Sequence, residues 1–171
     1  MKKILLFTFI MGLFLQTTMS QELPECKLRF ELPNDEWSLM FHQTDDDGIV
    51  TYVYNREPVT TAEGVSFTPY IGIIIEDLED EDTDVITFSI MKRFTIPFEV
   101  INVFIHESGI IDYTNAIGYK GTYVDEFERT LYWIHAINGT KGIQFIFESS
   151  SDTFELVDEE FLKSIKSIRV L

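Results

Sequence analysis

The sequence predicts an α+β protein: an α/β/α sandwich with a mainly antiparallel sheet and a C-terminal helix. Three observations support this fold class. Short segments of alternating apolar residues are separated by turn signals, which is typical of strands joined as hairpins. The aromatic segment 130–137 is apolar on both faces, so each face of its sheet needs a covering layer. The last segment of the chain carries apolar residues at helical spacing.

The first twenty residues have the features of a cleavable export signal. Two lysines precede an apolar stretch over 4–15, which is shorter than the ~20 residues that a membrane-spanning helix needs. The small residues Thr18 and Ser20 suit the shallow pockets of a signal peptidase. We therefore expect cleavage between Ser20 and Gln21, and a periplasmic or extracellular protein in which 21–171 forms a single α+β domain.

The charge of the exported part limits its partners. Residues 21–171 contain 11 basic and 29 acidic side chains, a net charge of −18. Such a surface repels phosphate backbones and anionic lipids, so neither nucleic acid nor stable membrane insertion is expected. An unidentified protein or small-molecule partner remains open, and so does the oligomeric state.

Cys26 is the only cysteine, which excludes a disulfide within the chain. The preceding residues Leu23, Pro24 and Glu25 do not suit lipid attachment. We interpret Cys26 as a small, half-buried residue at the start of a strand, with a free thiol or an intermolecular bridge as the alternative roles.

The first half of the chain predicts four strands, at 27–32, 37–44, 49–55 and 70–76. Asp45-Asp46-Asp47-Gly48 forms a hairpin turn, because Asp and Gly tolerate the positive φ angles of tight turns. The segment 56–69 reads as a loop.

A helix over 85–94 is predicted next, capped by Asp84 and with Val85, Phe88 and Met91 on one face. Pro97 ends it, and a strand follows at 98–107. Three strands at 117–124, 130–137 and 143–148 come after it, the last two joined by Asn138-Gly139, a strong hairpin signal.

The C-terminal helix is expected to open at Asp152, where Glu155 completes a capping box. One apolar stripe runs along it: Phe154, Val157, Phe161, Ile165 and Ile168.

Four segments together resemble small exported bacterial domains of the PsbP-like class: FELPNDEW, NAIGYKGTY, HAINGTKGIQFIFE and EEFLKSIKSIRV. These domains are relatives in fold of the photosystem II extrinsic protein and of a yeast nuclear-import cofactor. The resemblance spans nearly the whole exported chain. It implies the same sandwich, with members that mostly bind or scaffold, and it assigns no functional residue.

The acidic run 76–84 has seven carboxylates in nine residues. It lacks the glycine and the ligand spacing of a calcium loop, so a solvated loop is expected, with calcium binding as the alternative.

No residue is singled out as catalytic, cofactor-binding or metal-ligating. His42, His106 and His135 lie on separate predicted strands without short ligand spacing, and His135 is expected to be a satisfied histidine of the sheet. No nucleophile elbow or phosphate loop occurs. The tyrosines and tryptophans are expected to pack the core, with a ligand groove as the alternative.

The sequence therefore predicts an exported, non-catalytic binding or interaction domain. A hydrolase with an unrecognised active site, or a subunit of a cell-envelope assembly that pairs through a strand edge, are the alternatives.

Overall fold

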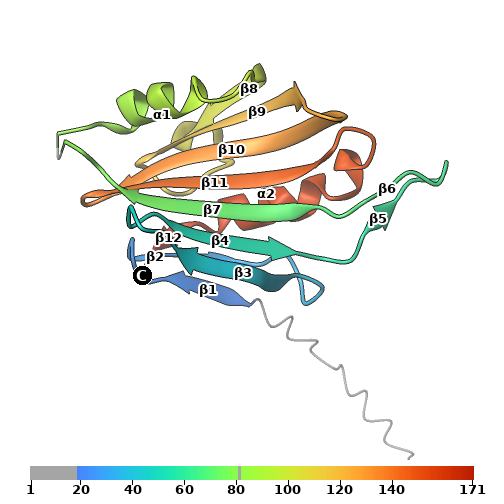
Figure 1. Cartoon of the computed structure of the whole chain (residues 1–171), viewed down its shortest axis with the longest axis horizontal. Helices are drawn as coiled ribbons and strands as arrows, with labels where there is room; N and C mark the ends of the chain where they lie inside the picture. The colour runs from blue at the N-terminus through green and yellow to red at the C-terminus, as the bar shows by residue number, and fades with distance from the viewer. Residues whose placement is uncertain (1–18, 81) are drawn as a thin grey trace, which may run out of the picture.

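The computed structural model of the chain describes residues 19–80 and 82–171. Its central element is a seven-stranded sheet with the order β3-β4-β7-β11-β10-β9-β8. Every neighbouring pair is antiparallel, as expected (Figure 1). The strands are β3 (Ser38–Thr44), β4 (Val50–Asn55), β7 (Tyr70–Asp77), β8 (Glu99–Ile105), β9 (Ala116–Val124), β10 (Glu128–Asn138) and β11 (Lys141–Ser150).

Five short strands form two further sheets. β1 (Ser20–Leu23), β2 (Leu28–Glu31) and β12 (Arg169–Val170) make a three-stranded sheet, and β5 (Val59–Thr60) pairs with β6 (Ser66–Phe67). The sequence predicted only β2 among these, because Leu28, Phe30 and Leu32 alternate with polar residues there, whereas the other four strands are too short to show such an alternation.

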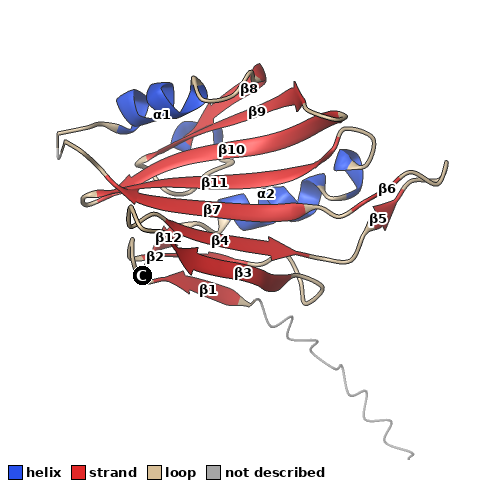
Figure 2. Cartoon of the chain, in the orientation of Figure 1, coloured by secondary structure: helices blue, strands red, loops and turns tan. Residues whose placement is uncertain are grey.

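One face of the large sheet packs against α2 (Asp158–Lys166) and the three-stranded sheet, as Figure 2 shows. The helix contributes Phe161, which is fully buried against Trp37 and Phe147. The whole predicted apolar stripe is buried: Phe154, Val157, Phe161, Ile165 and Ile168. This face therefore holds the main core.

The opposite face carries α1 (Val85–Arg93), which contacts β9 and β10. Asp84 caps the helix as predicted, accepting a hydrogen bond from the Thr87 amide. Both faces of the sheet thus have a helix, and the predicted α+β sandwich is confirmed. Phe88 is buried beneath α1, but Met91, expected on the same face, is exposed.

The C-terminal helix does not begin where the capping box was expected. β11 continues to Ser150, and a 3₁₀ turn at Phe154–Leu156 (η2) precedes α2. No side chain caps α2 at Val157. Three acidic residues in its first turn, 158–160, stabilise the helix dipole instead, so the predicted pair of Asp152 and Glu155 was wrong.

The predicted export signal lies outside the described residues except for its end. Ser20 begins β1 and pairs with Glu31, and the carbonyl of Met19 accepts a hydrogen bond from the Leu32 amide. Cleavage after Ser20 would leave the pairing of Gln21–Leu23 with β2 intact.

Candidate functional site: a cleft beside helix α1

A cleft of about 350 Å³ lies on the α1 face of the large sheet. It forms because α1 contacts β9 and β10 and leaves part of β7 and β11 uncovered. The chain segment that follows α1, with Thr95 and Ile96, makes one wall. The floor is apolar and comes from three strands: Ile74, Leu131, Trp133 and Ile146. We call this hollow the sheet cleft.

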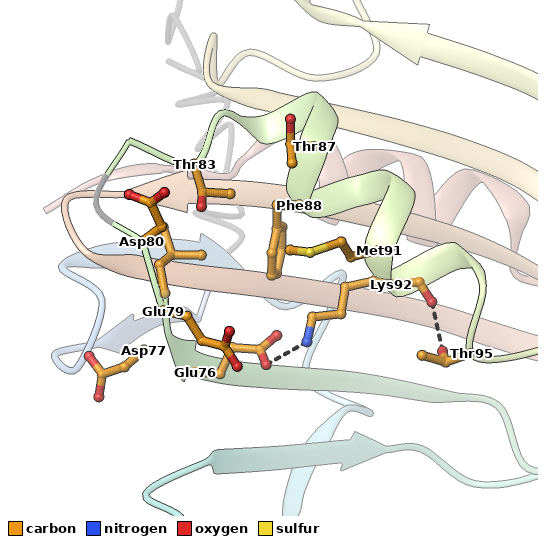
Figure 3. Close-up of a pocket in the computed structure, with 11 residues that line it drawn as sticks. Glu76, Asp77, Glu79, Asp80, Thr83, Thr87, Phe88, Met91, Lys92 and Thr95 are labelled. Carbon is orange, nitrogen blue, oxygen red and sulfur yellow. Dashed lines mark hydrogen bonds and ion pairs between the residues drawn. The ribbon is translucent and has the colours of Figure 1, made fainter.

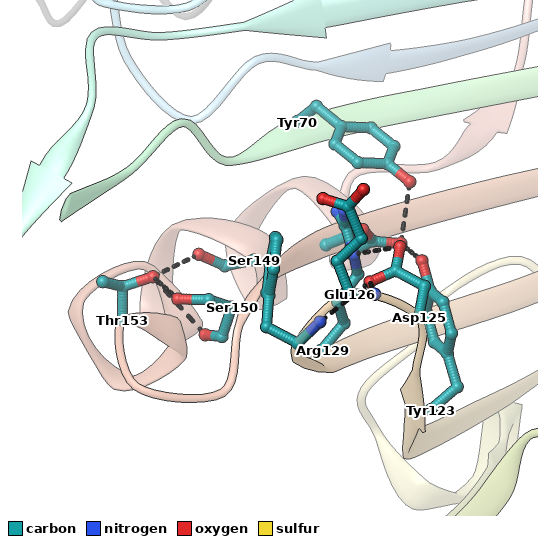
Figure 4. A network of polar contacts seen from close by, with 10 residues as sticks. Tyr70, Tyr123, Asp125, Glu126, Arg129, Ser149, Ser150 and Thr153 are labelled. Carbon is teal, nitrogen blue, oxygen red and sulfur yellow. Dashed lines mark hydrogen bonds and ion pairs between the residues drawn. The ribbon is translucent and has the colours of Figure 1, made fainter. Parts of the chain in front are cut away.

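A buried carboxylate closes one end of the sheet cleft. Glu148 is only 1% exposed. It accepts hydrogen bonds from the hydroxyls of Tyr70 (2.7 Å) and Tyr123 (2.9 Å) and pairs with Arg129 at 2.6 Å (Figure 4). Arg129 also contacts Asp125 and lies against the ring of Phe127. The charge of Glu148 is therefore fully compensated.

The two phenols of this network stay protonated. Burial and the adjacent Glu148 carboxylate together raise the pKa of Tyr70 and of Tyr123 far above the ordinary tyrosine value. Each hydroxyl donates a hydrogen bond to Glu148 and keeps lone pairs that can accept a hydrogen bond from a ligand.

An ion pair lies at the other end. Lys92 on α1 contacts Glu76 on β7 at 2.5 Å, and its backbone carbonyl accepts a hydrogen bond from the Thr95 hydroxyl at 2.6 Å. Lys92, Glu76 and Thr95 also line a second hollow of about 420 Å³, the acidic recess (Figure 3). The ion pair thus lies between two adjacent hollows.

The acidic recess contains part of the acidic run 76–84. Asp77, Glu79 and Asp80 lie around it, with Phe88 and Met91 of α1 on the facing side (Figure 3). Asp84 instead caps α1, and residue 81 lies outside the described residues. No cluster of three or more metal-ligating side chains occurs within residues 19–80 and 82–171.

The floor of the sheet cleft contains one oriented amide. The indole N–H of Trp133 donates to Gln144 Oε1 at 3.2 Å. Because an indole N–H can only donate, the amide atom that faces it must be the oxygen. Gln144 lines the cleft and is 7% exposed. Its NH₂ group has no hydrogen-bond partner among the described residues, so the cleft contains an unused donor.

His135 lies beneath α1 in a buried polar group. Its Nδ1 is 2.8 Å from the hydroxyl of Ser89, which is 2.7 Å from the hydroxyl of Tyr119. Nε2 lacks a partner in the described part of the chain, so the expectation of a satisfied histidine holds for one nitrogen only. Burial and the positive charges of Arg93 and Lys92 lower the pKa of His135 to about 3. The imidazole is neutral, and neither Ser89 nor His135 is accessible to a substrate.

The other residues considered in the sequence lie apart from the cleft. His42 on the edge strand β3 stacks on Tyr52 of the neighbouring strand β4. His106 lies in the short 3₁₀ turn after β8. Cys26 was expected to be half-buried at the start of a strand, but it is almost completely buried in the turn between β1 and β2. Burial raises the pKa of its thiol to about 11 and keeps it unreactive.

Sequence reasoning missed most of the polar residues around the cleft. Gln144 and Glu148 occupy alternating positions of an apolar strand and so share a face. The Asn138-Gly139 hairpin places Gln144 opposite His135 and Glu148 opposite Leu131. This register could have shown from the sequence that the two polar side chains share one face of the sheet. The aromatic residues divide: Tyr70, Tyr123 and Trp133 line the cleft, and most of the others pack in the core.

The overall arrangement is found in solved proteins. Cyanobacterial PsbP (CyanoP) from Synechocystis sp. PCC 6803 matches with a TM-score of 0.57 and 15% identity, over 94% of this chain and 96% of that one. The chain has a PsbP-like fold. This confirms the resemblance seen in the sequence, and at such identity it shows the fold alone.

Two further structures share the PsbP-like fold. A Bacteroides thetaiotaomicron protein matches with a TM-score of 0.54 and 9% identity, over 91% of this chain and 49% of that one. A Pseudomonas aeruginosa protein of unknown function matches with a TM-score of 0.50 and 9% identity, over 84% and 90%. No protein-family model and no curated protein matches the chain. Neither helix in the described part of the chain is long and apolar enough to span a bilayer.

Proposed function

We propose that this protein is an exported, non-catalytic binding domain that holds a ligand in the sheet cleft. The observation that carries the proposal is the cleft itself. It combines an apolar floor with polar groups held at fixed positions at both ends. This composition and its size of about 350 Å³ are typical of sites for small molecules.

The test uses Nile red, an uncharged dye whose fluorescence rises in apolar surroundings, with residues 21–171. Ile146→Trp places a larger side chain in the cleft and should weaken dye binding at least tenfold. Leu39→Trp makes a comparable change on β3, where Leu39 is 51% exposed, and should bind as the unmodified chain does. Equal binding by the Ile146→Trp protein would show that the cleft is not the binding site.

An interaction role receives support from a different observation. All seven residues of the edge strand β3 are exposed, and none is an Asp, Glu, Lys or Arg. Leu39, Met40 and Phe41 are among them. An edge of this kind is a site for strand pairing with another chain. Met40→Cys introduces an exposed thiol while Cys26 stays buried, so a maleimide that carries a photoreactive group, attached at residue 40 and activated by light in the native envelope, would form a covalent bond to a partner on β3. Absence of any cross-linked species would remove this role.

A hydrolase has no comparable support. The hydrogen-bonded Ser89 and His135 are both fully buried beneath α1.

A further inference from the structure

The charges around the sheet cleft are already paired within the protein. Lys92 contacts Glu76, and Glu148 contacts Arg129 as well as the two tyrosine hydroxyls. The chain as a whole has a net charge of −16, yet the cleft contains balanced pairs. The local chemistry of the cleft thus differs from that of the surface around it.

This balance disfavours a charged ligand. An ion that enters the cleft loses its water. Oε1 of Glu76 has no hydrogen-bond partner among the described residues, but Lys92 already neutralises the charge of this carboxylate. An ion therefore gains an uncompensated counter-charge only if it separates Lys92 from Glu76 or disrupts the Glu148 network. Breaking a largely buried pair leaves its other member unpaired, which costs more than the new contact returns. An uncharged molecule avoids both costs.

Gln144 adds a directional requirement. Its oxygen is occupied by the Trp133 indole, so its NH₂ group is the part left for a ligand. This donor faces the cleft, so a ligand that displaces water from the cleft must supply an acceptor to keep the donor hydrogen-bonded. The surrounding Ile74, Leu131 and Ile146 side chains favour an apolar body on that ligand.

We propose that the sheet cleft takes an uncharged, mainly apolar small molecule with a hydrogen-bond acceptor, such as a carbonyl oxygen, that binds the Gln144 amide. This assignment rests on the proposed function, because it specifies the ligand of the same cleft.

Three molecules of nearly equal shape test the charge requirement: indole-3-acetamide is neutral, indole-3-acetate is an anion and tryptamine is a cation. Their affinities for residues 21–171 are measured by NMR titration at neutral pH. Indole-3-acetamide should bind at least tenfold more tightly than either charged analogue. It should shift the signals of the Trp133 indole N–H and the Gln144 amide.

A variant tests the role of Gln144. Gln144→Met preserves side-chain length and a weak acceptor for Trp133 but removes the donor. It should weaken binding of indole-3-acetamide about 3- to 10-fold and leave 3-methylindole, which lacks the carbonyl, unchanged. Thermal unfolding of the variant checks that it folds. An equal loss for both ligands would mean that Gln144 acts only through packing.

The outcomes separate this inference from the proposed function. Tryptamine binding as tightly as the amide, or no binding by any of the three, overturns the ligand class. If Nile red binds to the unmodified chain and Ile146→Trp abolishes this binding, the cleft is still supported as the binding site. Dye binding that is insensitive to Ile146→Trp overturns both.

Discussion

Glu148 combines nearly complete burial with three donors on one carboxylate: Arg129 and the hydroxyls of Tyr70 and Tyr123. A carboxylate removed from water is tolerated only when hydrogen bonds and a counter-charge replace its hydration. The network therefore connects β7, β9, β10 and β11 at the end of the cleft, and each member depends on the others.

Replacing Glu148 with Gln should lower the free energy of unfolding by about 3 kcal/mol, since it removes the charge that Arg129 and both phenols satisfy. Urea denaturation at pH 7 measures this. The exposed Glu126→Gln is the matched control and should remain within about 0.5 kcal/mol of the unmodified protein. A small effect of Glu148→Gln would contradict a structural role for the buried carboxylate and its three donors.

His135 makes stability depend on pH. Its pKa is about 3 in the folded chain, against the ordinary value of 6.5 when the chain is unfolded. As the pH falls below about 6.5, the unfolded state gains a proton that the folded state does not bind until about pH 3. The free energy of unfolding therefore decreases as the pH falls from about 6.5 to about 3, and above about pH 6.5 His135 no longer makes it depend on pH.

His135→Gln removes this titration. Between pH 7 and pH 5 the variant should lose about 2 kcal/mol less stability than the unmodified protein loses. Urea denaturation at the two pH values gives the difference, and His42→Gln is the matched control for loss of a histidine. Identical losses in His135→Gln and the unmodified chain would show that His135 ionises while folded.

The two helices are attached to the sheet very differently. The apolar stripe over 154–168, which includes α2, is completely buried, whereas α1 exposes Ile86, Ile90 and Met91. α1 therefore has fewer apolar contacts to hold it in place. Because α1 supplies Lys92 and leads directly to Thr95 and Ile96, its attachment determines how well one wall of the cleft is held.

Asp84→Ala removes the side-chain acceptor for the Thr87 amide at the start of α1. Amide hydrogens of Thr87 and Phe88 should exchange several-fold faster with solvent, while those of α2 keep their rates. Hydrogen exchange followed by NMR measures both helices in one sample. Asp82→Ala, an exposed acid of the same loop, should leave α1 unchanged. Equal acceleration in both variants would attribute the effect to loop charge.

The sequence predicted two kinds of element correctly: those in which an apolar pattern repeats several times, and those that contain a specific hairpin turn. The Asn138-Gly139 hairpin and the α2 stripe are examples, and Gly139 indeed has a φ of +60°. The start of α2 was misplaced because Asp152 and Glu155 have the spacing of a capping box, yet the chain forms a turn there, in which the hydroxyls of Ser149 and Ser150 bond to Thr153. A ligand groove lined by aromatic residues was the alternative to core packing, but its position could not be predicted, because it depends on which strands α1 covers and no local pattern encodes this.

The surface as a whole opposes uncontrolled association through the sheet edges. Both outer strands contain an irregularity in their pairing, between Leu39 and Phe41 in β3 and between Val100 and Asn102 in β8. Bulges twist an edge away from regular pairing, and a strongly negative net charge makes copies repel one another. These features disfavour pairing between copies of this chain, whereas the charge does not oppose a β3 partner that carries basic residues.

The export proposal makes a prediction for the whole chain. In cells that produce it, the exported protein should begin at Gln21, as intact mass measurement would show. The loss of one ammonia is expected where the terminal glutamine cyclises. Ser20→Trp should block cleavage, because a bulky side chain does not fit the peptidase pocket.

The fold should tolerate this cleavage. Removing Met19 and Ser20 costs the hydrogen bond to Leu32 and the pairing with Glu31, while the fully buried Leu23 keeps its place in β1. Chains that begin at residue 19 and at residue 21 should therefore differ by no more than about 1.5 kcal/mol in the free energy of unfolding. An exported protein that still contains residues 1–20, or a much less stable chain beginning at Gln21, would contradict cleavage at this position.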